Sequence, residues 1–240
     1  MSPVKGGRIA AGILCLVLSG CSSYRVTVQG VEVDRLIESR KAPSAPEAEK
    51  REAVFHNDLG VLLEREDDLA GALKQYRLAR QKDPGLVPAY VNAGNVRVKL
   101  GELGEAKRLY RAALDRDPAN PRALNNLAWA MILEDGDLDG AISLLTLALA
   151  SDPEHPYLYL DTMGWALYRR GDVEDALSTL ALALEQTPEE EAYLRAETHH
   201  HLAVILREAG KKEEAARHLR ESIRYRPDPQ RERELEILTD

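Results

Sequence analysis

The chain has 240 residues, of which 44% are hydrophobic, 30% are charged and only 5% are aromatic. This composition is ordinary for a folded protein and leaves Ala and Leu as the main packing material, which favours helices. The formal net charge of −8 gives no support to nucleic-acid binding.

Residues 1–20 have the features of an export signal. Two basic residues, Lys5 and Arg8, precede a mostly apolar run of ten residues, which is short of the roughly 20 that span a bilayer as a helix. The run leads into Leu-Ser-Gly-Cys21. This order resembles the lipobox of bacterial lipoproteins, in which cleavage before the cysteine leaves that residue to carry the lipid.

The resemblance implies that Cys21 is acylated and anchors the mature chain to a membrane. Cys15 lies in the segment that would be removed, so an exported form has no disulfide. Ser22 follows the cysteine, as in outer-membrane lipoproteins. We therefore expect a lipid-anchored protein of the cell envelope, on the outer membrane and facing the periplasm. The alternative is a chance cysteine in an ordinary secretory signal.

Residues 21–52 are predicted to form a lipidated N-terminus and a flexible tether. Short polar residues dominate, with Pro43 and Pro46 among them. As a coil this segment would reach roughly 30 Å. Alternating valines between Arg25 and Val33 also permit a small hairpin or pairing with a partner strand, and the sequence leaves these alternatives open.

Five prolines divide the rest of the chain into units of similar length. They stand 34, 35, 35 and 39 residues apart, at Pro84, Pro118, Pro153, Pro188 and Pro227. Small and large apolar residues recur at matching offsets from each proline, as in the second unit with Tyr90, Ala93, Gly94, Ala106, Tyr110 and Ala113. This pattern resembles the tetratricopeptide repeat.

The resemblance implies an all-α fold, a right-handed α-solenoid of five helix hairpins with a C-terminal capping helix. The expected units cover approximately residues 53–86, 87–120, 121–155, 156–190 and 191–228, and the cap covers 228–240.

Three glycines, Gly60, Gly94 and Gly164, are expected where the first helix of a hairpin passes closest to the second, opposite an alanine such as Ala106. The interval of 39 residues predicts a longer first helix in the fifth unit, which begins early at a capping box, Thr187-Pro-Glu-Glu.

On each first helix, side chains opposite the packed stripe should line a concave face. In this family such grooves take extended peptides or helices, and asparagines at the sixth helix position can hold the ligand backbone. Asn92 and Asn126 occupy that position here, with Arg122 and Asn125 nearby. The alternative is that asparagine merely tolerates a solvated helix face.

The fourth unit carries an apolar stretch in which only Asp161 and Thr162 are strongly polar. Trp165 and Tyr168 fall on the stripe that should line the groove, next to Trp129 of the third unit. Exposed aromatic side chains in a concave setting are typical anchors for a partner. Alternatively, a tightly wound solenoid buries these rings against neighbouring helices.

No pattern predicts catalysis, a cofactor or a metal site. His199, His200 and His201 are consecutive, so their side chains point about 100° apart on a helix. An enzyme such as a wall hydrolase is the disfavoured class.

The leading hypothesis is a membrane-anchored adaptor that binds a peptide or helix of an envelope protein. In order and size the chain resembles the tetratricopeptide lipoproteins that help assemble type IV pilus secretins, polysaccharide export machines or outer-membrane barrels, with the pilus pilotin as the first choice. The alternative is a scaffold that self-associates, as a homo-oligomer without a peptide ligand, through its open ends or its tryptophans.

Overall fold

A computed structural model of the chain describes residues 27–28, 31–32, 44–134 and 136–239. The chain divides into two compact units, residues 1–44 and 45–240. The predicted signal peptide, Cys21 and most of the predicted tether lie outside the described residues. In the first unit, strands β1 (Thr27–Val28) and β2 (Val31–Glu32) pair antiparallel, with Val28 opposite Val31. This pairing corresponds to the hairpin alternative of the valine-rich segment.

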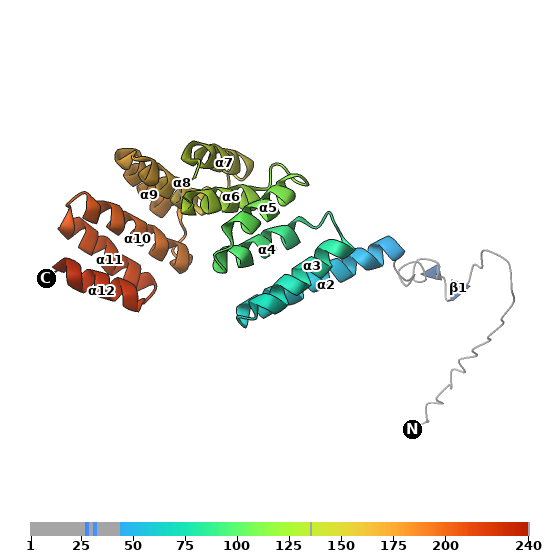
Figure 1. Cartoon of the computed structure of the whole chain (residues 1–240). Coiled ribbons are helices and arrows are strands. Elements are labelled where there is room, and N and C mark those ends of the chain that lie inside the picture. Colours follow the sequence, from blue (N-terminus) through green and yellow to red (C-terminus); the bar gives the residue numbers. More distant parts are fainter. Residues whose placement is uncertain (1–26, 29–30, 33–43, 135, 240) are drawn as a thin grey trace, which may run out of the picture. The chain divides into compact units, whose positions relative to one another are not determined.

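The described part of the second unit consists of helices joined by short turns (Figure 1). The helices are α2 (Ala45–Arg65), α3 (Leu69–Lys82), α4 (Val87–Lys99), α5 (Leu103–Leu114), α6 (Pro121–Leu133), α7 (Leu138–Ser151), α8 (Tyr157–Arg170), α9 (Val173–Gln186), α10 (Ala192–Glu208), α11 (Lys212–Tyr225) and α12 (Pro229–Thr239). None of the helices described is both long enough and apolar enough to cross a membrane.

The ten helices from α2 to α11 form five hairpins, each packed on the next, and α12 covers the last one. This is the predicted right-handed α-solenoid with a capping helix. The first helices α2, α4, α6, α8 and α10 contact one another along the array, whereas the described second helices are joined mainly through first helices. The first helices therefore form the inner side of the curve.

Helix ends follow from local sequence. In each hairpin the second helix ends two to four residues before a repeat proline, which lacks the N–H that a continuing helix needs. Asp68, Asn120 and Asp137 cap the following helices by accepting a hydrogen bond from the backbone three residues on. Between paired helices, Gly101 and Gly171 adopt positive φ values of 74° and 103°, which glycine adopts without strain.

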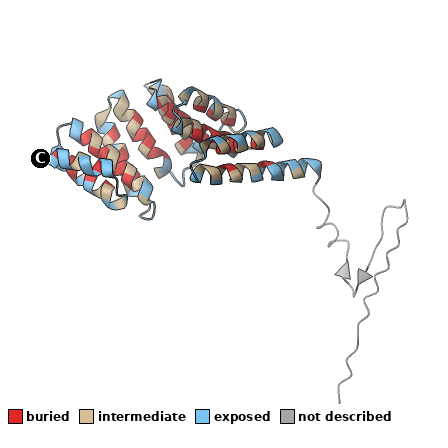
Figure 2. Cartoon of the chain, turned by 60° about the horizontal axis from the view of Figure 1, so that its bottom comes forward, coloured by how far each residue is buried: buried red, intermediate tan, exposed pale blue. Residues whose placement is uncertain are grey.

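Small residues bring the two helices of a hairpin together. Ala72, Ala106 and Ala176 are fully buried, and buried residues follow the inner sides of the helices (Figure 2). A Cβ on Gly164 would lie 3.3 Å from the Ala176 carbonyl oxygen, as the predicted approach of glycine and alanine requires, but the closest contacts are with larger side chains. A Cβ on Gly94 would meet the ring of Tyr110, and a Cβ on Gly164 would meet Leu180, in each case within 3.0 Å. The glycine therefore makes room for a large side chain one helical turn after the alanine.

Two helix starts differ from the sequence-based prediction. Helix α2 begins at Ala45, so residues 45–52, predicted as tether, extend the first hairpin. Helix α10 has 17 residues against 13 in α4, which confirms the longer helix of the fifth unit. Its start is not the predicted capping box, because the buried Thr187 ends α9 and its hydroxyl donates to the Ala183 carbonyl.

The capping helix is held by one buried cation and two leucines. Arg231 donates to Ser222 Oγ (2.9 Å) and to Glu197 Oε1 (2.7 Å), and Ser222 in turn donates to the Ala196 carbonyl. Leu235 and Leu238 pack on the apolar cluster of α10 and α11. Helix α12 thus covers the apolar side of the final hairpin.

The glycine contacts make a stability prediction. Gly94→Ala should destabilise the solenoid by about 1–3 kcal/mol, because the added methyl displaces the buried Tyr110 ring. Gly104→Ala in α5 is the matched control: its Cβ would meet nothing, so helix propensity should stabilise the fold by about 0.5–1 kcal/mol. Urea unfolding followed by circular dichroism measures both. Equal effects of the two substitutions would contradict the close-approach argument.

Candidate functional site: a groove along the first helices

A groove of about 610 Å³ runs along the inner side of the array. Its walls come from α4, α6, α8 and α10, with one tyrosine from α5. The lining residues are Asn95, Val98, Lys99, Tyr110, Asn125, Asn126, Trp129, Tyr157, Leu158, Asp161, Thr162, Tyr193, Leu194, Glu197 and His201. The groove therefore spans four successive hairpins.

Five of the nine predicted groove residues line this space: Asn125, Asn126, Trp129, Asp161 and Thr162. The other four, Asn92, Arg122, Trp165 and Tyr168, do not line it. Asn92 lies on α4, one turn before the lining residue Asn95, and Arg122 is exposed near the start of α6.

The aromatic side chains form a cluster, but they are not freely exposed. Trp165 stacks on His201 with ring centroids 4.6 Å apart, and it lies 5.1 Å from Tyr168. Trp129 lies 6.5 Å from His201. Both tryptophans are half-buried and pack against core clusters. The alternative prediction, that these rings pack against neighbouring helices, is therefore correct in part. Trp129 nevertheless lines the groove.

The asparagines link neighbouring first helices. Asn92 donates to Asn57 Oδ1 (3.0 Å), which connects α4 to α2. Asn126 donates to Asn95 Oδ1 (2.8 Å), which connects α6 to α4, and Tyr110 donates to the same oxygen. These amides therefore have a structural role that the sequence did not reveal. The buried Oδ1 of Asn125 has no hydrogen-bond partner among the described residues.

The charged groups of the groove are already paired. Lys99 contacts Glu64 at 2.7 Å, Asp161 contacts His201 at 3.0 Å, and Glu197 contacts Arg231 at 2.7 Å. A partner that required one of these charges would have to break an existing pair. Recognition in this groove therefore rests mainly on apolar surface, aromatic rings and amides.

The residues most available to a partner were missed by the sequence analysis. Leu158 is 37% exposed and Tyr193 is 57% exposed, and both line the groove. Tyr193 lies in the first turn of the long helix α10, so the 39-residue interval was the signal that could have found it. His201 also lines the groove, and its ring lies between those of Trp129 and Trp165.

The three consecutive histidines have separate partners, as the helical geometry predicted. His199 Nδ1 lies 3.0 Å from His218 Nδ1, His200 Nε2 lies 3.1 Å from Glu234, and His201 faces Asp161. Within the described ranges no group of three His, Cys, Asp or Glu side chains could hold a metal ion.

Comparison with solved structures supports the fold. TTC0263, a thermophilic repeat protein from Thermus thermophilus, is 19% identical with a TM-score of 0.66 and covers 78% of this chain and 98% of its own. PilW, described as a widely conserved type IV pilus biogenesis factor, is 19% identical with a TM-score of 0.64 and covers 72% and 77%. YrrB, described as having an unusual peptide-binding site, is 24% identical with a TM-score of 0.52 and covers 85% and 97%.

These similarities and the geometry define the fold as an α-solenoid of helix hairpins. Three family models described as tetratricopeptide repeat match residues 91–156, 133–199 and 196–229. The chain therefore carries tetratricopeptide repeats over more than half of its length. A comparison with curated proteins gave no significant match.

The buried pair His199 and His218 predicts a pH dependence. Burial lowers the pKa of His199 to about 4, with His218 as the second cause, and burial also lowers the pKa of His218. The unfolded chain, with an ordinary pKa near 6.5, then binds more protons than the folded chain. Stability should therefore be full above about pH 6.5 and fall as pH drops toward 4, by on the order of 2 kcal/mol.

Thermal unfolding between pH 7.5 and pH 4.5 measures this effect in the wild-type chain and in the His199→Gln/His218→Gln variant. The variant should lose less stability on acidification, although it is less stable at neutral pH. Identical pH slopes for both chains would contradict the assignment.

Proposed function

We propose that the chain is a membrane-anchored adaptor of the bacterial cell envelope whose groove holds an extended segment or a helix of another envelope protein. The observation that carries this proposal is the presence of two exposed apolar side chains in the groove, Leu158 and Tyr193. Exposed aromatic and aliphatic groups in a concave surface are the usual anchors of a protein partner. In this role the chain binds and positions its protein partner and does not catalyse a reaction.

The envelope location is proposed from the N-terminal sequence. The basic start, the short apolar run and the lipobox-like Cys21 support export and lipidation, and Ser22 supports the outer membrane over the inner one. A lipid anchor on Cys21 would place the repeats in the periplasm. The tether would then be the segment between Cys21 and the start of α2 at Ala45.

Assembly of an envelope machine is the proposed process. The fold similarity to PilW, whose description names type IV pilus biogenesis, supports a pilus role ahead of protein secretion or polysaccharide export. YrrB, with its described peptide-binding site, supports the binding of a peptide within this fold.

A second candidate function is self-association into a scaffold. One observation favours it: the first helix α2 presents Val54, Phe55 and Leu62 to solvent, with Phe55 62% exposed. This end of the array has no described helix over it, whereas α12 covers the other end. A second copy that packed on this apolar row would leave the groove free.

Lipidation is tested by substituting the cysteines one at a time. Cys21→Ser should release the chain from the membrane fraction and abolish the added acyl mass, because Cys21 is the proposed acceptor. Cys15→Ser is the matched control and should leave both unchanged, since residue 15 lies in the segment proposed to be removed. Fractionation and mass spectrometry of the mature chain measure the result. A membrane-bound Cys21→Ser chain would contradict the anchor.

Partner binding is tested with substitutions that spare the core. Leu158→Ala/Tyr193→Ala should weaken capture of envelope proteins by roughly tenfold or more, because both side chains are exposed anchors of the groove. Leu147→Ala/Leu182→Ala is the control, since these leucines are similarly exposed but lie on the second helices α7 and α9. The measurement is quantitative co-purification from envelope extract.

Two outcomes would decide against the groove. Equal recovery of partners by both variants would remove the groove as the binding surface. A discrete dimer in light scattering that Phe55→Ala abolishes, with no groove-dependent partner, would favour the self-associating scaffold.

A further inference from the structure

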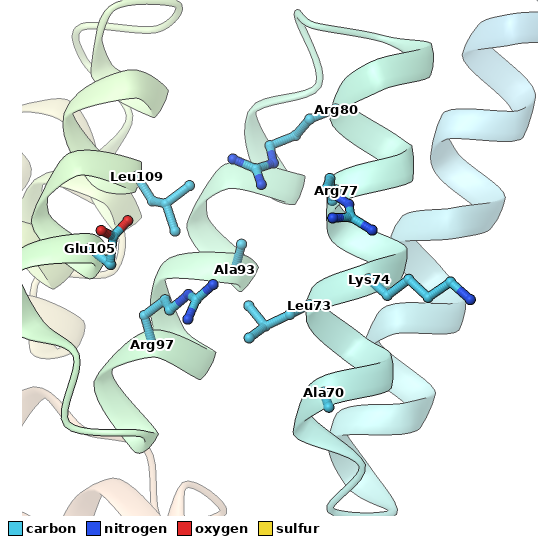
Figure 3. Close-up of a pocket in the computed structure, with 9 residues that line it drawn as sticks. All are labelled: Ala70, Leu73, Lys74, Arg77, Arg80, Ala93, Arg97, Glu105 and Leu109. Atoms are coloured by element: carbon cyan, nitrogen blue, oxygen red, sulfur yellow. The ribbon is translucent and has the colours of Figure 1, made fainter.

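A second hollow lies on the face made by the second helices and is independent of the groove. We call it the basic cleft; it is lined by Ala70, Leu73, Lys74, Arg77, Arg80, Ala93, Arg97, Glu105 and Leu109 and has a volume of about 330 Å³ (Figure 3). Its walls are α3 and α5, and α4 lies between them. None of these residues lines the groove.

The basic cleft carries an excess of positive charge in a chain whose net charge is −8. Four of its lining residues are basic and one is acidic. Figure 3 shows the guanidinium groups of Arg80 and Arg97 pointing toward the space between α3 and α5, whereas Arg77 lies over α3 and Lys74 points away. The single carboxylate, on Glu105, is already paired with Arg108.

Arg80 lies at the centre of this charge. It is half-buried, its guanidinium carbon lies 5.1 Å from the centre of the Tyr90 ring, and that ring also carries Arg116 at 4.1 Å. Burial lowers the pKa of Arg80 below its usual range, and Arg97, Arg116 and Arg77 add to this. Since arginine stays charged at neutral pH, like charges crowd a partly desolvated space.

Carboxylates in the protein neutralise only part of the positive charge of these arginines. Arg97 pairs with Glu102, while no ion pair of Arg77 or Arg80 occurs among the described residues. An incoming anion would accept charge-assisted hydrogen bonds from these groups and relieve their mutual repulsion. Arginine is suited to this because its planar fork matches a carboxylate.

The floor of the basic cleft is apolar, since Leu73 and Leu109 flank Ala93 (Figure 3). We propose that the basic cleft binds an acidic segment of a protein partner, with a carboxylate between Arg80 and Arg97 and a neighbouring aliphatic side chain on Leu73 and Leu109. A recessed space of this size suits one or two side chains. The recessed shape and the apolar floor suit side chains of a peptide better than a flat anionic lipid surface.

The test uses two capped peptides, Leu-Glu-Leu-Glu and its uncharged counterpart Leu-Gln-Leu-Gln, added to the isotope-labelled segment 44–240, which contains all the described helices. The acidic peptide should shift the NMR signals of Leu73, Ala93 and the arginine Nε–H groups, and the uncharged peptide should not. Arg77→Gln/Arg97→Gln should weaken binding by roughly tenfold or more. Arg77 is exposed, and Arg97→Gln removes only a surface ion pair, so the fold is retained.

Arg217→Gln/Arg220→Gln is the control with the same change in charge, because both residues are exposed on α11 and lie outside the basic cleft. It should bind the acidic peptide as the wild type does. The absence of shifts up to millimolar peptide, or equal weakening in both double variants, would overturn the proposal. Arg97-dependent binding to phosphatidylglycerol vesicles without a peptide response would overturn it in favour of a membrane contact. Leu158→Ala/Tyr193→Ala should leave peptide binding unchanged, which separates this site from the groove.

Discussion

The structure depends on how closely the two helices of a hairpin can approach. In three hairpins this approach is set by a glycine of the first helix that lies against a large buried side chain of the second, as Gly94 lies against Tyr110. Fully buried alanines on both helices maintain the same short separation. Because the hairpins are thin and similar, each packs on the next, and their first helices come into contact along the inner side.

The contact between first helices creates the groove, and most polar side chains of the groove form hydrogen bonds between these helices. Asn92 and Asn126 bind asparagines of the preceding first helix, and His201 binds Asp161. The hydrogen bonds that could have held a partner's backbone instead fix one hairpin to the next. The surface left for a partner is apolar and aromatic, which favours shape and burial over charge in recognition.

The two hollows of the solenoid differ in chemistry because they lie on different helices. The groove on the first helices has paired charges and exposed Leu158 and Tyr193, whereas the basic cleft beside α3 and α5 gathers guanidinium groups over an apolar floor. A solenoid has no single central core, so each face can evolve its own binding surface without disturbing the other. An adaptor with two such faces could hold two segments at once.

The sequence by itself determined the architecture. The spacing of the prolines, the recurring alanines and glycines and the extra length before Pro227 predicted five hairpins, a long α10 and a cap, because these features act through local backbone geometry and short-range packing. It also predicted five residues of the groove, since helical periodicity tells which side of a helix faces inward. Only the tertiary structure decided which side chains remain available to a partner and which are used in contacts within the protein. The burial of Trp165 against His201, the pairing of Asn92 with Asn57 and the gathering of Arg77, Arg80 and Arg97 join residues of different hairpins, and a one-dimensional pattern does not specify contacts made across them.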